Sequence, residues 1–172
     1  MKLRELPTFI STMITEKTID ECIEILANED TDFVQAMADD QPVLAGYLAS
    51  EEIEAFTQEE VQYMYYLAVL CWMCFDHTYE ELEEVDEDFL SQKEEQNWNR
   101  IESLRPNSLK NIIDRWIPEY EEPELLYHLE DALMLDEEDP EHPVTKIGQI
   151  PMFVTLLTVV DGLIEARKKL VV

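Results

Sequence analysis

Two histidine–carboxylate pairs have the spacing that would place metal ligands on one face of a helix. His77 and Glu81 are four residues apart, as are Glu124 and His128. Residues four apart on a helix are neighbours, so each pair could present an imidazole and a carboxylate to one divalent cation. Such pairs also arise readily in an acidic chain, where they are salt-linked surface histidines. Both readings stay open from the sequence.

Further carboxylates surround the first pair. Two overlapping Glu-x-x-Glu motifs occur there, Glu80-x-x-Glu83 and Glu81-x-x-Glu84. They resemble the first of the two magnesium-binding motifs of the helical nucleotide pyrophosphohydrolases. The second motif, Glu-x-x-Asp, is missing at a suitable distance, since Arg105 stands three residues after Glu102. The sequence therefore assigns no catalytic, cofactor-binding or metal-binding residue. The metal candidates that it leaves are His77, Glu80, Glu81, Glu84, Glu124 and His128.

Other catalytic chemistries find little support. Cys71 and Cys74 form a C-x-x-C motif, but they lie well inside an apolar run, whereas a redox pair needs the amides at a helix start. We expect them to be buried, as free cysteines usually are. The serines lack the Gly-x-Ser-x-Gly elbow of hydrolases, and three glycines in 172 residues leave no Gly-rich loop for a phosphate. No cofactor is predicted.

The charge of the chain is strongly negative and unevenly spread. Its 40 acidic and 12 basic residues give a formal net charge of −28. Residues 18–92 and 116–145 contain no Lys or Arg, while the segment 93–115 between them is nearly neutral. This potential repels phosphates and anionic lipids, so we expect no direct nucleic-acid partner and no membrane. A basic protein partner is favoured; solubility or salt adaptation is the alternative explanation of the charge.

The hydrophobic pattern predicts an all-α fold. Apolar residues recur at helical spacing, and Thr18 with Glu21 and Thr57 with Glu60 have the form of capping boxes. The helix predicted over residues 61–82 is apolar nearly all round through Phe75, and the helix predicted from near Pro151 is apolar on all sides at first, which indicates two buried central helices. We therefore predict a single domain of seven or eight helices over residues 1–172, built around these two.

The two halves of the chain are weakly alike. The segments 41–53 and 122–134 share a proline, a leucine two residues later and a further leucine four residues after that. Each follows a short apolar helix and precedes a long apolar one. This pattern indicates an internal duplication of helical hairpins over residues 31–79 and 108–166. The alternative is chance, because an N-terminal proline followed by apolar residues at helical spacing gives the same pattern.

These observations favour a non-enzymatic interaction protein that binds a basic protein partner through its acidic surface. One variant is a DNA mimic, whose carboxylates imitate phosphates in the groove of a DNA-binding protein. The alternative is a divalent-metal-assisted hydrolase that uses the carboxylates near His77. A homo-oligomer, in which segment 93–115 meets an acidic face of another copy, is a third. Three cysteines without an export signal predict a cytoplasmic protein.

Overall fold

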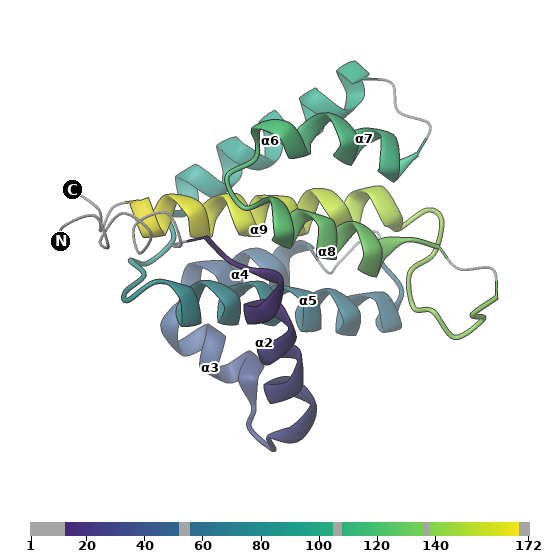
Figure 1. Cartoon of the computed structure of the whole chain (residues 1–172). Helices are drawn as coiled ribbons and strands as arrows, with labels where there is room; N and C mark the ends of the chain where they lie inside the picture. The colour runs from purple at the N-terminus through teal and green to yellow at the C-terminus, as the bar shows by residue number, and fades with distance from the viewer. Residues whose placement is uncertain (1–12, 52–55, 105–107, 136–137, 169–172) are drawn as a thin grey trace, which may run out of the picture.

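The computed structural model describes residues 13–51, 56–104, 108–135 and 138–168. Within these ranges the chain forms eight α-helices, one short 3-10 helix and no strand (Figure 1), so the predicted all-α fold is confirmed. The elements in chain order are α2 (Glu16–Asn28), α3 (Phe33–Asp40), α4 (Pro42–Glu51), α5 (Gln58–Thr78), α6 (Glu87–Leu104), α7 (Leu109–Trp116), η2 (Ile117–Glu119), α8 (Pro123–Leu133) and α9 (Gln149–Lys168).

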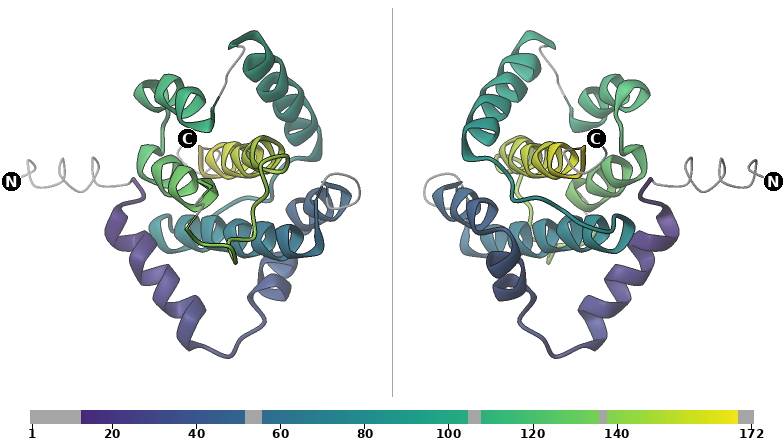
Figure 2. Two further views of the ribbon diagram at one scale, coloured as in Figure 1. Left: turned by 90° about the vertical axis from the view of Figure 1, so that its right-hand side faces the viewer. Right: turned by 90° about the vertical axis from the view of Figure 1, so that its left-hand side faces the viewer.

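Helix α9 occupies the centre of the molecule. Figure 2 shows it nearly end-on, with α6 on one side, α7 and α8 on the other, and α5 below. It contacts α4, α5, α6 and α8, and every residue from Met152 to Ile164 is buried. Helix α5 is buried in the same way from Leu67 to Phe75. The prediction of two buried central helices is therefore confirmed, because all-round apolar helices need neighbours on every side.

By length and composition alone, α9 could also cross a membrane, over the 19 residues Gln149–Arg167. The stretch extends past Asp161, because Leu163 and Ile164 are apolar again. Packing explains the apolar character, since 72% of this window is buried inside the bundle.

One predicted helix start is confirmed and another is wrong. Thr57 and Glu60 form the predicted capping box at the start of α5. Helix α2 starts at Glu16 and not after Thr18, because the Thr15 hydroxyl oxygen accepts a hydrogen bond from the Thr18 amide at 3.2 Å. Thr15 has the extended backbone of an N-cap residue, and its side chain satisfies an amide of the first turn.

Helix α5 ends at Thr78, four residues earlier than the pattern predicts. The following residues 79–86 are non-helical and run to the start of α6. Gln41, which is fully buried between α3 and α4, holds this connection: its amide nitrogen donates to the Glu83 carbonyl at 2.9 Å and its amide oxygen accepts from the Val85 amide at 2.8 Å. A contact across more than 40 residues of sequence thus satisfies backbone groups that a longer helix would have paired internally.

The two halves show the same order of elements, a short helix, a helix that starts at a proline and a long buried helix. Their packing differs. In the first half the short helix α3 contacts the long helix α5, whereas in the second half the helix that starts at a proline, α8, contacts the long helix α9. The duplication stays a prediction.

Glu60 has a second role beside its capping box. Its side chain is buried, and Oε2 accepts hydrogen bonds from the amide and the hydroxyl of Thr145, each at 2.9 Å. This carboxylate therefore joins the start of α5 to the loop before α9. Gly148 follows in that loop, and a Cβ there would overlap the Glu60 carboxylate.

We predict that Gly148→Ala lowers the free energy of unfolding by about 1–3 kcal/mol, the usual cost of overpacking a filled site. Gly46→Ala is the matched control, because a Cβ at Gly46 inside α4 meets no atom within 4 Å. We expect that control to raise stability by about 0.5–1 kcal/mol through helix propensity. Urea denaturation measures both changes, and equal effects of the two substitutions would contradict this role of Glu60.

Candidate functional site

A groove of about 790 Å³ lies between α2 and the α7–α8 pair. Helix α2 packs against α8, and α8 against α7, so three helices meet along it. Six carboxylates line the groove: Glu16 and Asp20 from α2, Asp114 from α7, and Glu124, Glu130 and Asp131 from α8. We call this set the acidic groove. Acids that are remote in sequence thus share one concave surface.

The acidic groove carries little compensating positive charge among the described residues. Lys110 is the one lysine that lines it, and its Nζ already pairs with Asp114 at 3.6 Å. His128 also lines the groove, but burial lowers its pKa, opposed by the nearby Asp131 and Asp20 carboxylates. A lowered pKa leaves this imidazole neutral at pH 7. The groove therefore has a strongly negative potential.

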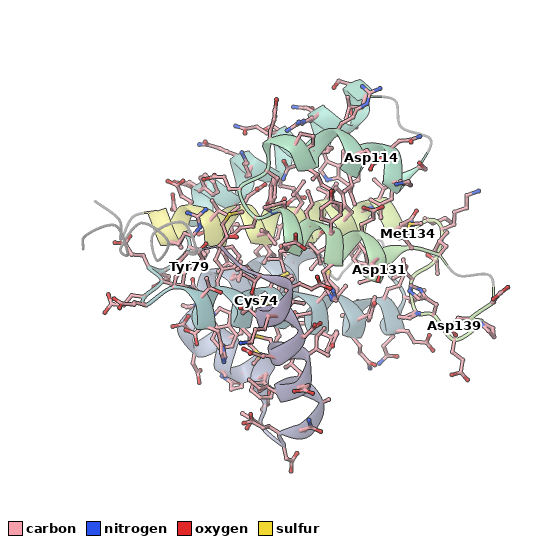
Figure 3. The ribbon with its side chains drawn as sticks, viewed as in Figure 1. Cys74, Tyr79, Asp114, Asp131, Met134 and Asp139 are labelled. Carbon is pink, nitrogen blue, oxygen red and sulfur yellow. The ribbon has the colours of Figure 1, made fainter. Side chains whose placement is uncertain are left out.

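Apolar side chains accompany these charges. Tyr127 and Met134 line the acidic groove, and their side chains are 49% and 40% exposed. Figure 3 shows Asp114, Asp131 and Met134 along the same side of the molecule. Exposed aromatic and methionine side chains within a charged surface are typical of protein interaction sites. The groove thus offers both charge and apolar contacts to a partner.

The structure places the six candidate metal ligands in two separate regions, the acidic groove and the end of α5 with the connection that follows it. Glu124 and His128 lie on α8, with helical spacing, and both line the acidic groove. His77 and Glu81 do not share a helix face, because α5 ends at Thr78. The His77 ring turns back to its own helix, with Nδ1 at 3.0 Å from the Met73 carbonyl oxygen.

The other two carboxylate candidates, Glu80 and Glu84, lie with Glu81 in the non-helical connection and are exposed. No group of three or more His, Cys, Asp or Glu side chains suited to a metal ion occurs in the part of the chain that the structure describes.

All three cysteines are free and buried, as the sequence predicts for Cys71 and Cys74. Burial raises the pKa of the Cys71 thiol to about 12. A thiol with so high a pKa is a poor nucleophile at neutral pH, because the thiolate is the reactive form.

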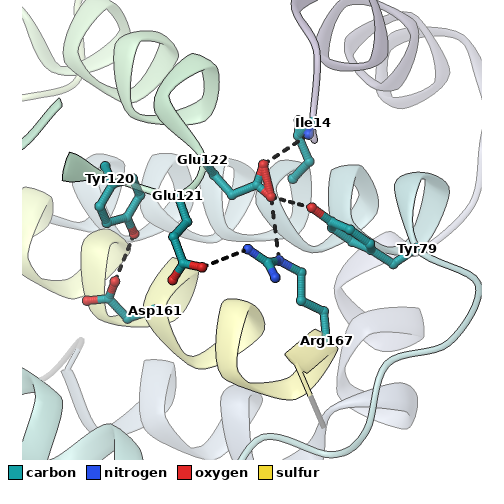
Figure 4. Close-up of polar contacts among 7 residues, drawn as sticks. All are labelled: Ile14, Tyr79, Tyr120, Glu121, Glu122, Asp161 and Arg167. Carbon is teal, nitrogen blue, oxygen red and sulfur yellow. Dashed lines mark hydrogen bonds and ion pairs between the residues drawn. The ribbon is translucent and has the colours of Figure 1, made fainter. Parts of the chain in front are cut away.

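A second group of carboxylates lies inside the fold, at the end of α9 (Figure 4). Glu122 is fully buried and accepts hydrogen bonds from the Ile14 amide at 2.9 Å and the Tyr79 hydroxyl at 2.5 Å. Arg167 Nε lies 3.7 Å from Glu122 Oε2, and another nitrogen of that guanidinium lies 3.5 Å from Glu121. Burial raises the pKa of Glu122, while its hydrogen bonds and Arg167 oppose the shift. Glu122 therefore joins the segment before α2, the end of α5 and the end of α9.

Asp161, on α9, is another buried carboxylate and is 8% exposed. Its two oxygens accept hydrogen bonds from the Tyr120 hydroxyl at 2.8 Å and the Asn97 amide at 3.1 Å. Asn97 also donates to the Thr158 hydroxyl at 3.2 Å. Burial raises the pKa of Asp161. This network ties α6 and the turn after η2 to α9.

Comparisons with protein families, curated proteins and solved structures found no match for this chain. The arrangement of its own residues is therefore the basis for any functional conclusion.

Sequence reasoning misses the buried polar residues. Asn97 lies in a segment without apolar residues, which predicts exposure, and Glu122 lies in an acidic stretch. Asp161 carries a usable signal, since it is one acid inside a long apolar run, and such a residue needs hydrogen-bond partners when buried. The acidic groove carries no local signal, because α2 and α8 are about 100 residues apart in sequence.

We predict that Glu122→Ala lowers the free energy of unfolding by about 3–5 kcal/mol, because it leaves Arg167 without its buried partner. Glu95→Ala is the matched control, an exposed glutamate in the middle of α6 that should change stability by no more than about 0.5 kcal/mol. Chemical denaturation gives both values. A loss at Glu122 no larger than that of the control would show that its network does not hold the fold.

Proposed function

We propose that the protein binds a basic protein partner, and that a lysine- or arginine-rich segment of this partner occupies the acidic groove. The supporting observation is that six carboxylates from three helices line one groove, in which Lys110 is the one lysine and is already paired with Asp114. Charge complementarity of this kind accelerates association and selects the partner. Tyr127 and Met134 would contact apolar side chains of the bound segment.

The groove suits a polypeptide segment better than a small ligand. Its volume of about 790 Å³ is lined by residues from three helices, and no three carboxylates among the described residues are grouped closely enough to hold one metal ion. A basic segment would satisfy several carboxylates at once, each exposed ion pair contributing at most about 1 kcal/mol. Affinity then depends on the number of pairs and falls as salt screens them.

A DNA mimic is the narrower form of this proposal. A DNA-binding protein presents its basic surface to phosphates, and the acidic groove would take their place. This form predicts that duplex DNA competes with the protein for the partner. A partner that docks through a basic surface other than its DNA-binding surface would instead bind DNA and the protein at the same time. The metal-assisted hydrolase stays a prediction that no particular contact among the described residues favours.

We predict that a synthetic lysine-rich amphipathic peptide binds the protein, and that the triple variant Asp20→Asn, Glu124→Gln, Asp131→Asn binds it about tenfold or more weakly. Loss of three exposed ion pairs accounts for that factor. Isothermal titration calorimetry at two salt concentrations measures the affinity, which should fall as salt rises.

The matched control removes the same net charge elsewhere, with Glu81→Gln, Glu95→Gln and Glu102→Gln in the connection before α6 and on α6 itself. These glutamates are exposed and do not line the groove. The control variant should bind almost as tightly as the wild type. Equal weakening of both variants, or no binding of the peptide, would refute the groove as the docking site.

A further inference from the structure

A second hollow, of about 270 Å³, lies between α6, η2 with its flanking residues, and α9. It is separate from the acidic groove, and no residue lines both. Its volume is close to the lower end of the range for small-molecule sites, about 300–1,000 Å³. Phe89, Trp116 and Ile164 give it an apolar part. The volume lies just below that range, so the hollow suits only a ligand of few atoms.

Two of the few basic residues of this chain line the hollow. Lys93 and Arg100 lie on α6 with Asn97 between them, at a spacing that places all three on one helix face. The guanidinium of Arg100 lies 4.2 Å from the centre of the Trp116 ring, a cation–π contact that fixes its direction. Neither Lys93 nor Arg100 comes within 4.0 Å of a carboxylate in the described ranges of the chain.

Four carboxylates also line the hollow, but two already have partners inside the protein. Asp161 is held by Tyr120 and Asn97, as described above. Glu121 pairs with Arg167 at 3.5 Å.

The remaining two, Glu119 and Glu165, form no ion pair with the described basic residues. Among the described residues, the ionic groups of the hollow without an ion-pair partner are therefore two basic, Lys93 and Arg100, and two acidic. The hydrogen-bond donors to Asp161 are neutral, and this carboxylate lies near both bases.

We propose that this hollow binds a small zwitterion of the α-amino acid class, with its carboxylate on Lys93 and Arg100 and its ammonium group on Glu119 and Glu165. A simple anion would meet the two free glutamates, and a simple cation would meet the two free bases. A zwitterion satisfies both sets, and its carbon skeleton lies against Phe89, which is half-buried, whereas the other two apolar residues of the hollow are buried. Charge-assisted hydrogen bonds of this kind are stronger than neutral ones. This function is additional to partner binding and does not depend on it.

The test is a titration of the purified full chain with each standard α-amino acid in turn, followed by saturation-transfer NMR and calorimetry. Acetate and methylammonium serve as the two halves of the ligand. We expect saturable binding of at least one amino acid and much weaker binding of either half. Lys93→Gln and Glu119→Gln should each weaken binding about tenfold, because each removes one charge-assisted contact.

Arg115→Gln is the matched control, since Arg115 is exposed on α7 and does not line the hollow. It should bind the amino acid as the wild type does, and thermal melting of all variants checks that they fold. The proposal is overturned if no amino acid binds, if acetate or methylammonium binds as tightly as the amino acid, or if Lys93→Gln binds like the control.

Discussion

Burial of α9 on all sides is the constraint on which the rest of this fold depends. Its residues from Met152 to Ile164 are buried without interruption, so helices must cover every face of it. Helices α4, α5, α6 and α8 do so, and the apolar side chains of the chain are gathered around this axis. Most of the acidic residues are consequently left on outer helices and loops. An overall charge of −28 is thereby compatible with one contiguous apolar core.

The few acids that are buried in the core connect segments that are distant in sequence. In the described ranges these are Glu60, Glu122 and Asp161, and each accepts hydrogen bonds from residues far away in sequence. Burying a carboxylate is costly unless such partners compensate for the lost water. Glu60 and Glu122 lie at the starts of α5 and α8, whereas Asp161 lies inside α9. The contacts of Glu60 and Glu122 fix helix starts, and those of Asp161 join the middle of α9 to α6 and to the turn after η2.

The sequence predicts the middles of the helices better than their ends or their mutual arrangement. Apolar periodicity identifies α5 and α9, and the capping box at Thr57 is local, so it is found correctly. The end of α5 depends on Gln41 and Glu122, which no window around Thr78 contains. For that reason His77 and Glu81 do not share the helix face that their spacing predicts. The acidic groove likewise needs the packing of α2 on α8, which periodicity does not specify.

The central proposal is that the six carboxylates of the acidic groove form the docking site of a basic segment. NMR of the ¹⁵N-labelled full chain, titrated with a lysine-rich peptide, tests it most directly. The account predicts chemical-shift changes confined to α2, α7 and α8 around Asp20, Glu124 and Asp131, with α6 unaffected. Changes spread evenly over all exposed acids, those of α6 included, would contradict it and would show that the charge serves solubility alone.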